Sequence, residues 1–399
     1  MFAFRHEPLK SLYKLYAYVA TICVRLPYAN ITSRIQALRP RRTWSARRAY
    51  ILPLLRARIE DWFATGLPLS PGHDPEEIVA SGQADALGFV WVPAIDPGLI
   101  VGEVSEMAEL NGVKPKKTHG YWLKSQKVTG KGDYKADEGE KVVMYFHGGG
   151  YVMSSSHPNG GPTGPICSGI LGNCTTVTRI FSCGYRLSSS YPYPAANPFP
   201  AALLDALAGY QYLLRTIGVR GENIIILGDS AGGHLAVSLV RYLATHNLNE
   251  LPTPGALVLL SPTVEFEITH KGSGSSLNRN AATDYCGIFF KGYPGKSLLG
   301  NFPEKEALTN AWISPASLQL SRFEGLFTGF PSTYIVCGEA EIGLDAMRTF
   351  RDRLIGDIGE TKVTYDEVKD ATHDFITMSW HEPERSNILK IIGEWIDAR

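Results

Sequence analysis

The stretch "NIIILGDSAGGHLAVSLV", residues 223–240, decides the fold of this chain. A run of apolar residues leads into Gly-Asp-Ser-Ala-Gly-Gly, and apolar residues at helical spacing follow. The pattern predicts a buried strand, a sharp turn and a helix, with glycines on both sides of Ser230 to relieve crowding in the turn. Because serine is a preferred N-cap residue, the local pattern allows Ser230 to be either a nucleophile or a helix cap.

A second motif, "YFHGGGYV" at residues 145–152, bears on this choice. Three glycines, Gly148 to Gly150, follow another predicted strand, and glycines let the main chain come close to a ligand. Acyl transfer needs backbone N–H donors aimed at a developing oxyanion, and such a loop offers them. A flexible glycine turn would explain the glycines but not their pairing with the serine motif. The two motifs together favour a nucleophilic Ser230.

The rest of the chain alternates strand-like and helix-like segments from about residue 140 onward, which predicts an α/β fold with a mostly parallel sheet. Strands are predicted over 141–146, 174–183, 223–228, 256–261, 332–338 and 362–368, and helices over 162–172, 200–216, 231–245, 344–356 and 384–397. Earlier in the chain we predict a helix over 50–67, a strand over 119–128 and a polar hairpin loop over 129–141. Residues 61–399 are expected to form the main domain, in which 263–325 is long enough to be a lid insertion.

In the order and approximate spacing of its motifs, the chain from about residue 140 to the end resembles the hormone-sensitive lipase-like branch of the α/β-hydrolase superfamily. The shared motifs are HGGG (147–150), YRL (185–187), PFPAALLDA (198–206) and GDSAGG (228–233). The resemblance implies the α/β-hydrolase fold with an N-terminal helical cap segment. It also implies an oxyanion hole formed by Gly148, Gly149, Gly150 and Ala231, with His147 orienting the glycine loop. The sequence departs from the family after YRL, where Ser-Ser-Ser replaces the usual Ala-Pro-Glu.

A serine nucleophile needs a base, and in this fold the triad follows the order Ser, acid, His. His373 directly follows the last predicted strand, whereas we interpret His270 and His381 as surface histidines. The family's acid falls three residues after the glycine that ends the preceding strand, which corresponds to Glu341. Most relatives have Asp there, but the longer carboxylate can still orient an imidazolium. Asp345 is the second candidate for the acid, with a helix N-cap as its alternative role.

Charge is unevenly distributed along this chain of 399 residues with zero net charge. Residues 1–60 contain twelve Lys and Arg against two Asp and Glu, so the remainder carries about −10. No nucleic-acid-binding motif accompanies the arginines, and we expect no nucleic-acid partner. Within this segment "LYAYVATICV", residues 15–24, is an uncharged run too short to span a bilayer as a helix. Three interpretations remain open: a signal-peptide region, an interfacial helix on a membrane surface, or a helix packed over the active site.

Composition indicates little further chemistry. The six cysteines show neither pairing nor metal-like spacing, so they predict buried free thiols, at Cys23, Cys167, Cys174, Cys183, Cys286 and Cys337. No metal or organic cofactor is expected. Sequons at Asn30 and Asn173 are motifs that arise often by chance. A cytoplasmic or membrane-associated location, the surface of the endoplasmic reticulum included, is favoured over secretion.

The sequence therefore predicts a serine hydrolase that cleaves carboxylic esters through Ser230, Glu341 and His373. We expect a small-molecule ester with a short to medium acyl group, such as the acetyl ester of a sterol, lipid or secondary metabolite. An amidase or peptidase would use the same triad, but no accompanying propeller repeat is visible. The alternative from another class is a receptor-like binding protein, which in this family loses the histidine. The presence of His373 favours catalysis.

Overall fold

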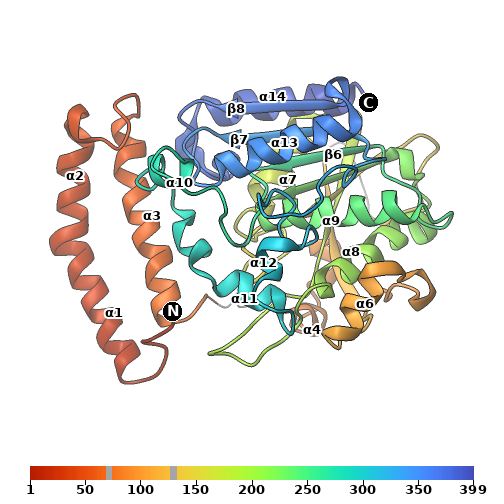
Figure 1. Ribbon diagram of the computed structural model, residues 1–399, viewed down its shortest axis with the longest axis horizontal. Coiled ribbons are helices and arrows are strands. Elements are labelled where there is room, and N and C mark those ends of the chain that lie inside the picture. The colour runs from red at the N-terminus through yellow and green to blue at the C-terminus, as the bar shows by residue number, and fades with distance from the viewer. Residues whose placement is uncertain (69–73, 126–132) are drawn as a thin grey trace.

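The computed structural model describes residues 1–68, 74–125 and 133–399 of the chain. Its centre is an eight-stranded sheet of order β1-β2-β4-β3-β5-β6-β7-β8 (Figure 1). The pairings of β1 with β2 and of β2 with β4 are antiparallel, and all others are parallel. The strands are Phe89–Val92 (β1), Thr118–Lys124 (β2), Lys141–Phe146 (β3), Val177–Cys183 (β4), Ile224–Asp229 (β5), Ala256–Leu260 (β6), Ser332–Gly338 (β7) and Val363–Val368 (β8).

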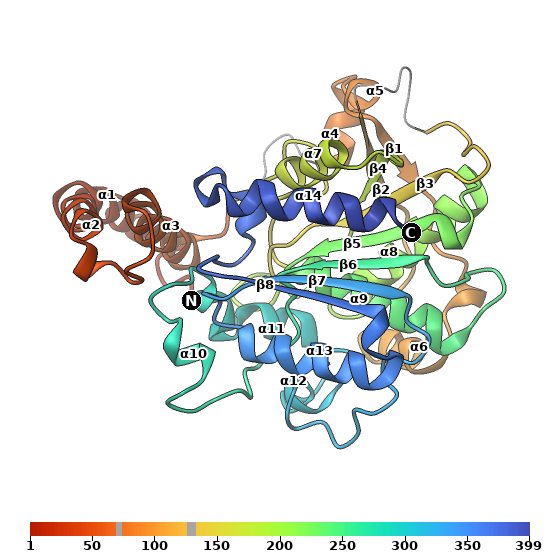
Figure 2. The same ribbon diagram turned by 90° about the horizontal axis from the view of Figure 1, so that it is seen from above.

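Helices cover both faces of this sheet, as expected for parallel strands with continuous apolar sequences (Figure 2). On one face lie α7 (Thr163–Asn173) and α14 (Glu384–Asp397), packed against Val143 and Tyr145 of β3. Val142 and Met144 point to the opposite face, which is covered by α6 (Gly102–Leu110), α8 (Ala201–Gln211), α9 (Ala231–His246) and α13 (Leu344–Ile358). The alternation along β3 thus divides one sheet between two hydrophobic cores.

The strands and helices predicted after residue 140 are confirmed, with differences of a few residues at their ends. The strand predicted from residue 174 begins at Val177, because the N–H and hydroxyl groups of Thr175 and Thr176 instead bind the Asp397 carboxylate. Helix α8 continues as a π-helical segment, Tyr212–Ile217. The sequence analysis missed β1, a four-residue strand at the edge of the sheet.

The predicted hairpin between residues 129 and 141 is wrong. Strand β4 lies between β2 and β3, so these two strands, although consecutive in the chain, do not pair with each other. Residues 129–132 of that loop, and 126–128 of the strand predicted before it, lie outside the described residues. Polar composition identifies a connection, but strand order depends on contacts that are distant in sequence.

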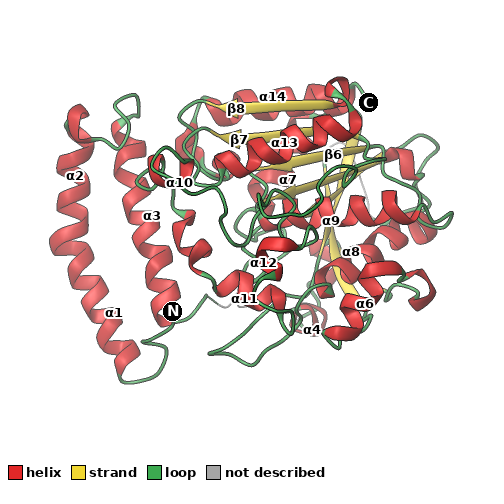
Figure 3. Ribbon diagram, in the orientation of Figure 1, coloured by secondary structure: helices red, strands yellow, loops and turns green. Residues whose placement is uncertain are grey.

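The N-terminal segment forms an arm of helices at one end of the molecule (Figures 1 and 3). Helix α1 (Leu9–Ala20) continues through a π-helical segment, Thr21–Arg25, into α2 (Leu26–Arg34). This arm packs along α3 (Ala46–Thr65), which lies between the arm and the sheet domain in both views. Small helices complete the fold: α4 (Pro75–Ala80), α5 (Ala84–Leu87), α10 (Ser276–Arg279), α11 (Tyr293–Leu299) and α12 (Glu306–Thr309).

Candidate active site

Ser230 stands on the sharp turn between β5 and α9. Its backbone has φ +50° and ψ −118°, a conformation that is strained for a residue with a side chain. A Cβ at Gly228 would lie 2.2 Å from the Gly232 carbonyl oxygen, and a Cβ at Gly232 would lie 2.1 Å from the carbonyl oxygen of Phe146. Both positions therefore need glycine. The Ser230 side chain makes no capping hydrogen bond, so its interpretation as a helix cap is wrong.

Two side chains from later strands complete a chain of hydrogen bonds to this serine. The Ser230 hydroxyl lies 2.9 Å from Nε2 of His373, and Nδ1 of His373 lies 2.8 Å from Oε2 of Glu341. His373 follows β8, and Glu341 follows β7, so both come from the carboxyl ends of parallel strands. The structure brings together the three residues that the sequence analysis selected. With the proton on Nδ1, Nε2 is free to accept the hydroxyl proton of the serine.

Several contacts hold Glu341 in this position. Its Oε1 accepts hydrogen bonds from the Ser261 hydroxyl at 2.7 Å and from the Gly338 N–H at 2.5 Å. Beside it, the buried Asp284 carboxylate accepts the N–H groups of Cys286 and Ile342, which fixes the loop that carries the glutamate. Oε2 of Glu341 thus reaches the imidazole, while Oε1 accepts the hydrogen bonds from Ser261 and Gly338.

Asp374, directly after the histidine, places a further carboxylate at the site. Its Oδ2 lies 3.3 Å from Nε2 of His373, and its buried Oδ1 has no hydrogen-bond partner among the described residues. Burial by itself lowers the pKa of His373, but Asp374, Cys286 and Glu341 together raise that pKa well above its ordinary value. Asp374 was not among the predicted site residues. Its position next to the histidine was the only available signal.

The glycine loop is held against the turn by Asp229. The N–H of Gly148 lies 3.0 Å from both carboxylate oxygens of Asp229, and the Tyr145 hydroxyl donates to Oδ1 at 2.5 Å. Burial raises the pKa of Asp229 to about 6, although the hydrogen bonds from Tyr145 and Gly148 act to lower this pKa. Because the Gly148 N–H is already engaged, the prediction that it faces the oxyanion does not fit the geometry. Within the described part of the chain, the N–H groups of Gly149, Gly150 and Ala231 donate no hydrogen bond.

His147 lies at the start of this loop, as expected. Its Nδ1 is 2.7 Å from the Gly148 carbonyl oxygen, and its ring stacks on Tyr185 with centroids 4.3 Å apart. The Tyr185 hydroxyl donates to the His147 carbonyl oxygen at 2.6 Å. Burial lowers the pKa of His147 to about 4, so the ring is neutral at physiological pH. It is suited to hold the loop rather than to act as a base.

The other candidates lie away from the serine. Asp345 accepts the Ser276 N–H at 2.7 Å and forms ion pairs with Arg279 and Arg348, so it is not the carboxylate that contacts His373. The prediction that His381 lies at the surface is wrong, because it is fully buried and its Nε2 lies 2.8 Å from the Thr372 hydroxyl. His270 is only partly exposed and lies between Glu265 and Thr349.

A cavity of about 340 Å³ opens onto Ser230 and His373. Its walls are mostly apolar, and three side chains of α3, Leu55, Ile59 and Trp62, contribute to them. The segment 263–325 between β6 and β7 contributes most of the remaining aromatic wall, with Phe266, Tyr285, Phe289 and Phe290. Two distant parts of the chain therefore enclose the space in front of the serine.

Comparison with known proteins identifies the family of this chain. Residues 143–377 match the model of the family described as alpha/beta hydrolase fold, and this range is more than half of the chain. The chain belongs to this family. The matched range of the α/β hydrolase runs from within β3 to beyond β8 and includes Ser230, Glu341 and His373.

Individual relatives of this α/β hydrolase are named as esterases and acetyl-hydrolases. The chain is 25% identical to the esterase LipU of Mycobacterium tuberculosis over 276 residues, which are 68% of this chain and 82% of the relative. It is 26% identical to an acetyl-hydrolase of Streptomyces hygroscopicus over 261 residues, which are 64% and 75% of the two chains. A solved structure of a hormone-sensitive lipase from a metagenome library is 25% identical, with a TM-score of 0.56, and the match covers 88% of this chain and 97% of that one. The resemblance to the hormone-sensitive lipase-like branch is confirmed.

The described residues of this hydrolase contain no group of three His, Cys, Asp or Glu side chains placed to hold a metal ion. The cysteines are free, and all except Cys23 are buried, which confirms the predicted buried thiols at five of the six positions. Cys286 lines the cavity, and burial raises its pKa to about 12, so it carries a neutral thiol beside the histidine.

Proposed function

We propose that this chain, a carboxylic ester hydrolase, cleaves small-molecule esters with Ser230 as nucleophile, His373 as general base and Glu341 as the acid of the triad. The observation that carries the proposal is the continuous set of contacts from the Ser230 hydroxyl through the imidazole to the Glu341 carboxylate, at 2.9 and 2.8 Å. The same arrangement of nucleophile, base and orienting carboxylate supports acyl transfer on several unrelated folds.

The reaction follows from these positions. Ser230 attacks the acyl carbonyl carbon while Nε2 of His373 takes its proton, and the carbonyl oxygen becomes an oxyanion. The N–H groups of Gly149, Gly150 and Ala231 stabilise that charge. His373 then gives its proton to the departing alcohol, which leaves an acyl-serine. Water, deprotonated by His373, attacks this ester and releases the carboxylic acid, while the proton returns to Ser230.

The cavity supports esters of an apolar alcohol with a short to medium acyl group. A space of about 340 Å³ lies near the lower end of the range for small-molecule sites, and its aromatic and aliphatic walls favour apolar groups. The relative named as an acetyl-hydrolase supports acetyl-type esters. The contact between His373 and Ser230 favours catalysis over the receptor-like alternative, and the esterase names of the relatives favour esters over amides.

The experiment that tests the proposal compares hydrolysis of p-nitrophenyl acetate, butyrate and octanoate by the wild type and by Ser230→Ala. We expect Ser230→Ala to lower kcat by at least about 10³-fold, because loss of a triad nucleophile removes most of the rate enhancement. Ser168→Ala, on the exposed side of α7, serves as the matched control and should leave kcat unchanged. A wild type inert on all three esters, or a Ser230→Ala variant with normal kcat, would overturn the proposal.

A further inference from the structure

The N-terminal arm, defined as residues 9–34, turns a row of large apolar side chains to solvent. Leu12, Leu15, Tyr16, Val19 and Ile22 recur at intervals of three and four residues and are between 47% and 63% exposed. Residues at this spacing share one face of a helix. The apolar run 15–24 does not line the cavity in front of Ser230. The pocket is instead covered by α3.

The face of the arm that packs on α3 is the less hydrophobic one. Its buried positions are Ala17, Ala29 and Ser33. It is also held by polar contacts to Asp61 of α3, which accepts hydrogen bonds from the Tyr13 hydroxyl at 3.1 Å and from Arg25 at 2.9 Å. A surface helix of a globular protein ordinarily turns its apolar face inward. In the arm the apolar face is turned outward and the less hydrophobic face inward. Packing within this chain therefore does not account for the apolar row.

The charges around this row are almost all positive. Glu7 is the only acidic residue among residues 1–59, whereas Lys14 and Arg34 are exposed on the arm itself. The remainder of the chain, beyond residue 60, carries a net charge of about −10. An anionic surface would repel this part of the molecule and attract the N-terminal segment. An apolar row with basic residues at its margins is the pattern of a helix that lies in the headgroup region of an anionic bilayer.

We propose that the arm docks this hydrolase on the surface of an anionic lipid bilayer, with its apolar row inserted among the headgroups. Self-association through the same face is less favourable, because two copies would bring like charges together. The exposed apolar surface also extends to Tyr18, Val24 and Tyr28, which is wider than the seam of a two-helix pair. Among the described residues no helix is long and apolar enough to cross a membrane.

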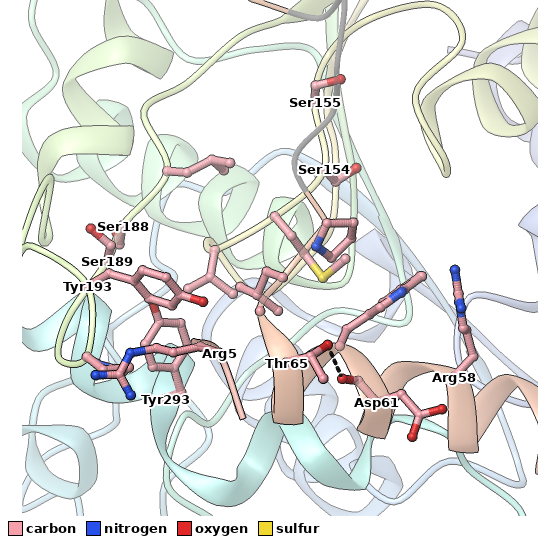
Figure 4. A pocket seen from close by; sticks show the side chains of 18 of the residues that line it. Arg5, Arg58, Asp61, Thr65, Ser154, Ser155, Ser188, Ser189, Tyr193 and Tyr293 are labelled. Carbon is pink, nitrogen blue, oxygen red and sulfur yellow. Dashed lines mark hydrogen bonds between the residues drawn. The ribbon is translucent and has the colours of Figure 1, made fainter. Parts of the chain in front are cut away.

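A groove connects the arm to the catalytic cavity. It has a volume of about 1830 Å³ and is lined by Ala17 of α1, by Asp61 and Trp62 of α3, and by Met153 and Ser154 after the glycine loop. Figure 4 shows Asp61 on the helix along one wall and Ser154 across from it. Trp62, Met153 and Ser154 also line the cavity in front of Ser230. If the proposed esterase function holds, a lipophilic ester leaving the bilayer would enter the site through this groove.

The experiment is flotation of the full chain with vesicles of neutral phosphatidylcholine or of phosphatidylcholine containing one quarter phosphatidylglycerol. We expect the wild type to float with the anionic vesicles at low salt and to be released as salt rises. Leu12→Gln/Leu15→Gln/Val19→Gln should lower the vesicle partition coefficient by at least about tenfold. The matched control, Leu110→Gln/Leu318→Gln/Ile391→Gln, changes three apolar residues of the main domain that are 45% to 57% exposed, and it should float like the wild type.

Two further measurements keep the outcome decisive. Both triple variants should retain the wild-type melting temperature and the wild-type rate on soluble p-nitrophenyl acetate, so that binding is tested apart from the esterase function. Light scattering reports the oligomeric state. A wild type that does not float with anionic vesicles, or an arm variant that floats as well as the control, would overturn the proposal. So would a wild-type dimer that the arm variant converts to a monomer while neither binds vesicles.

Discussion

At the scale of single residues, the most consequential feature is a second carboxylate, Asp374, beside the imidazole of the proposed triad. Glu341 contacts Nδ1 of His373, whereas Asp374 approaches Nε2, the atom that faces Ser230. In the proposed mechanism both carboxylates stabilise the imidazolium that forms when the serine proton is taken up. Burial also raises the pKa of Asp374 itself well above its ordinary value, and the His373 charge opposes that rise. The same two carboxylates raise the pKa of His373, so its neutral form, which the proposed mechanism needs, is less populated at low pH.

Asp374→Asn should shift the acid limb of the pH profile of kcat/KM to lower pH. The proposed mechanism needs a neutral His373, so activity is present above the pKa of this residue and is lost as pH falls through it. Asp374 raises that pKa, and removal of its charge lowers the pKa and moves the limb with it. Hydrolysis of p-nitrophenyl acetate between pH 5 and 9 measures the shift. The exposed Asp352→Asn is the control, and an unchanged limb in Asp374→Asn would contradict the assignment.

At the scale of elements, the site depends on how closely the glycine loop after β3 approaches the turn after β5. The two strands are neighbours in the sheet, with Phe146 opposite Gly228. This register places Gly148 within hydrogen-bond distance of Asp229, and the loop that follows then faces the serine. A hydrogen bond across two strand ends thus aligns the proposed oxyanion-hole donors with Ser230, the proposed nucleophile.

Gly148→Ala should therefore damage catalysis more than folding. A Cβ at this position would lie 2.3 Å from Oδ2 of Asp229 and 3.0 Å from Cβ of Ser230, so the loop must move. We expect kcat to fall by about 10² to 10³-fold, as for loss of an oxyanion-hole donor, with a much smaller change in KM. Gly172→Ala on α7 meets no atom within 4 Å and is the control. Steady-state kinetics on p-nitrophenyl butyrate make the comparison, and equal kcat values would exclude this role for the loop.

At the scale of the whole molecule, the segment between α2 and α3 ties the N-terminal arm to the loops that carry Glu341 and His373. Arg41 forms ion pairs with Glu339 and Asp370 at 2.8 and 3.1 Å. The indole N–H of Trp44 donates to the Asp370 carbonyl oxygen, and Arg48 donates to the same oxygen. The segment between α2 and α3, together with the first turn of α3, is thus attached directly to the loops after β7 and β8.

Arg48→Ala should lower the free energy of unfolding by about 2 to 3 kcal/mol, because it removes a buried cation and leaves Glu384 without its partner at 3.0 Å. The neighbouring Arg47, which is exposed, provides a matched control in Arg47→Ala, with an expected change within about 0.5 kcal/mol. Urea unfolding of the full chain, followed by tryptophan fluorescence, measures both. Equal midpoints for the two variants would show that the contacts of Arg48, at the start of α3, do not stabilise the fold.

The sequence by itself determined the features that are written locally and in order along the chain. The apolar runs before Gly148 and Gly228 predicted buried strands, because continuous apolar sequences belong to strands covered on both faces. The order of serine, acid and histidine selected Ser230, Glu341 and His373, since each follows a strand whose carboxyl end meets the same edge of the sheet.

Only the tertiary structure decided which polar groups have a hydrogen-bond partner and which side chains are buried or exposed. The Gly148 N–H is taken by Asp229, His381 is buried against Thr372, and Asp374 is left with one oxygen unpaired. The apolar row on the arm faces solvent because polar contacts with Asp61 turn the other face of the helix inward. Each of these outcomes depends on contacts between residues far apart in the sequence, and periodicity and spacing carry no information about such contacts.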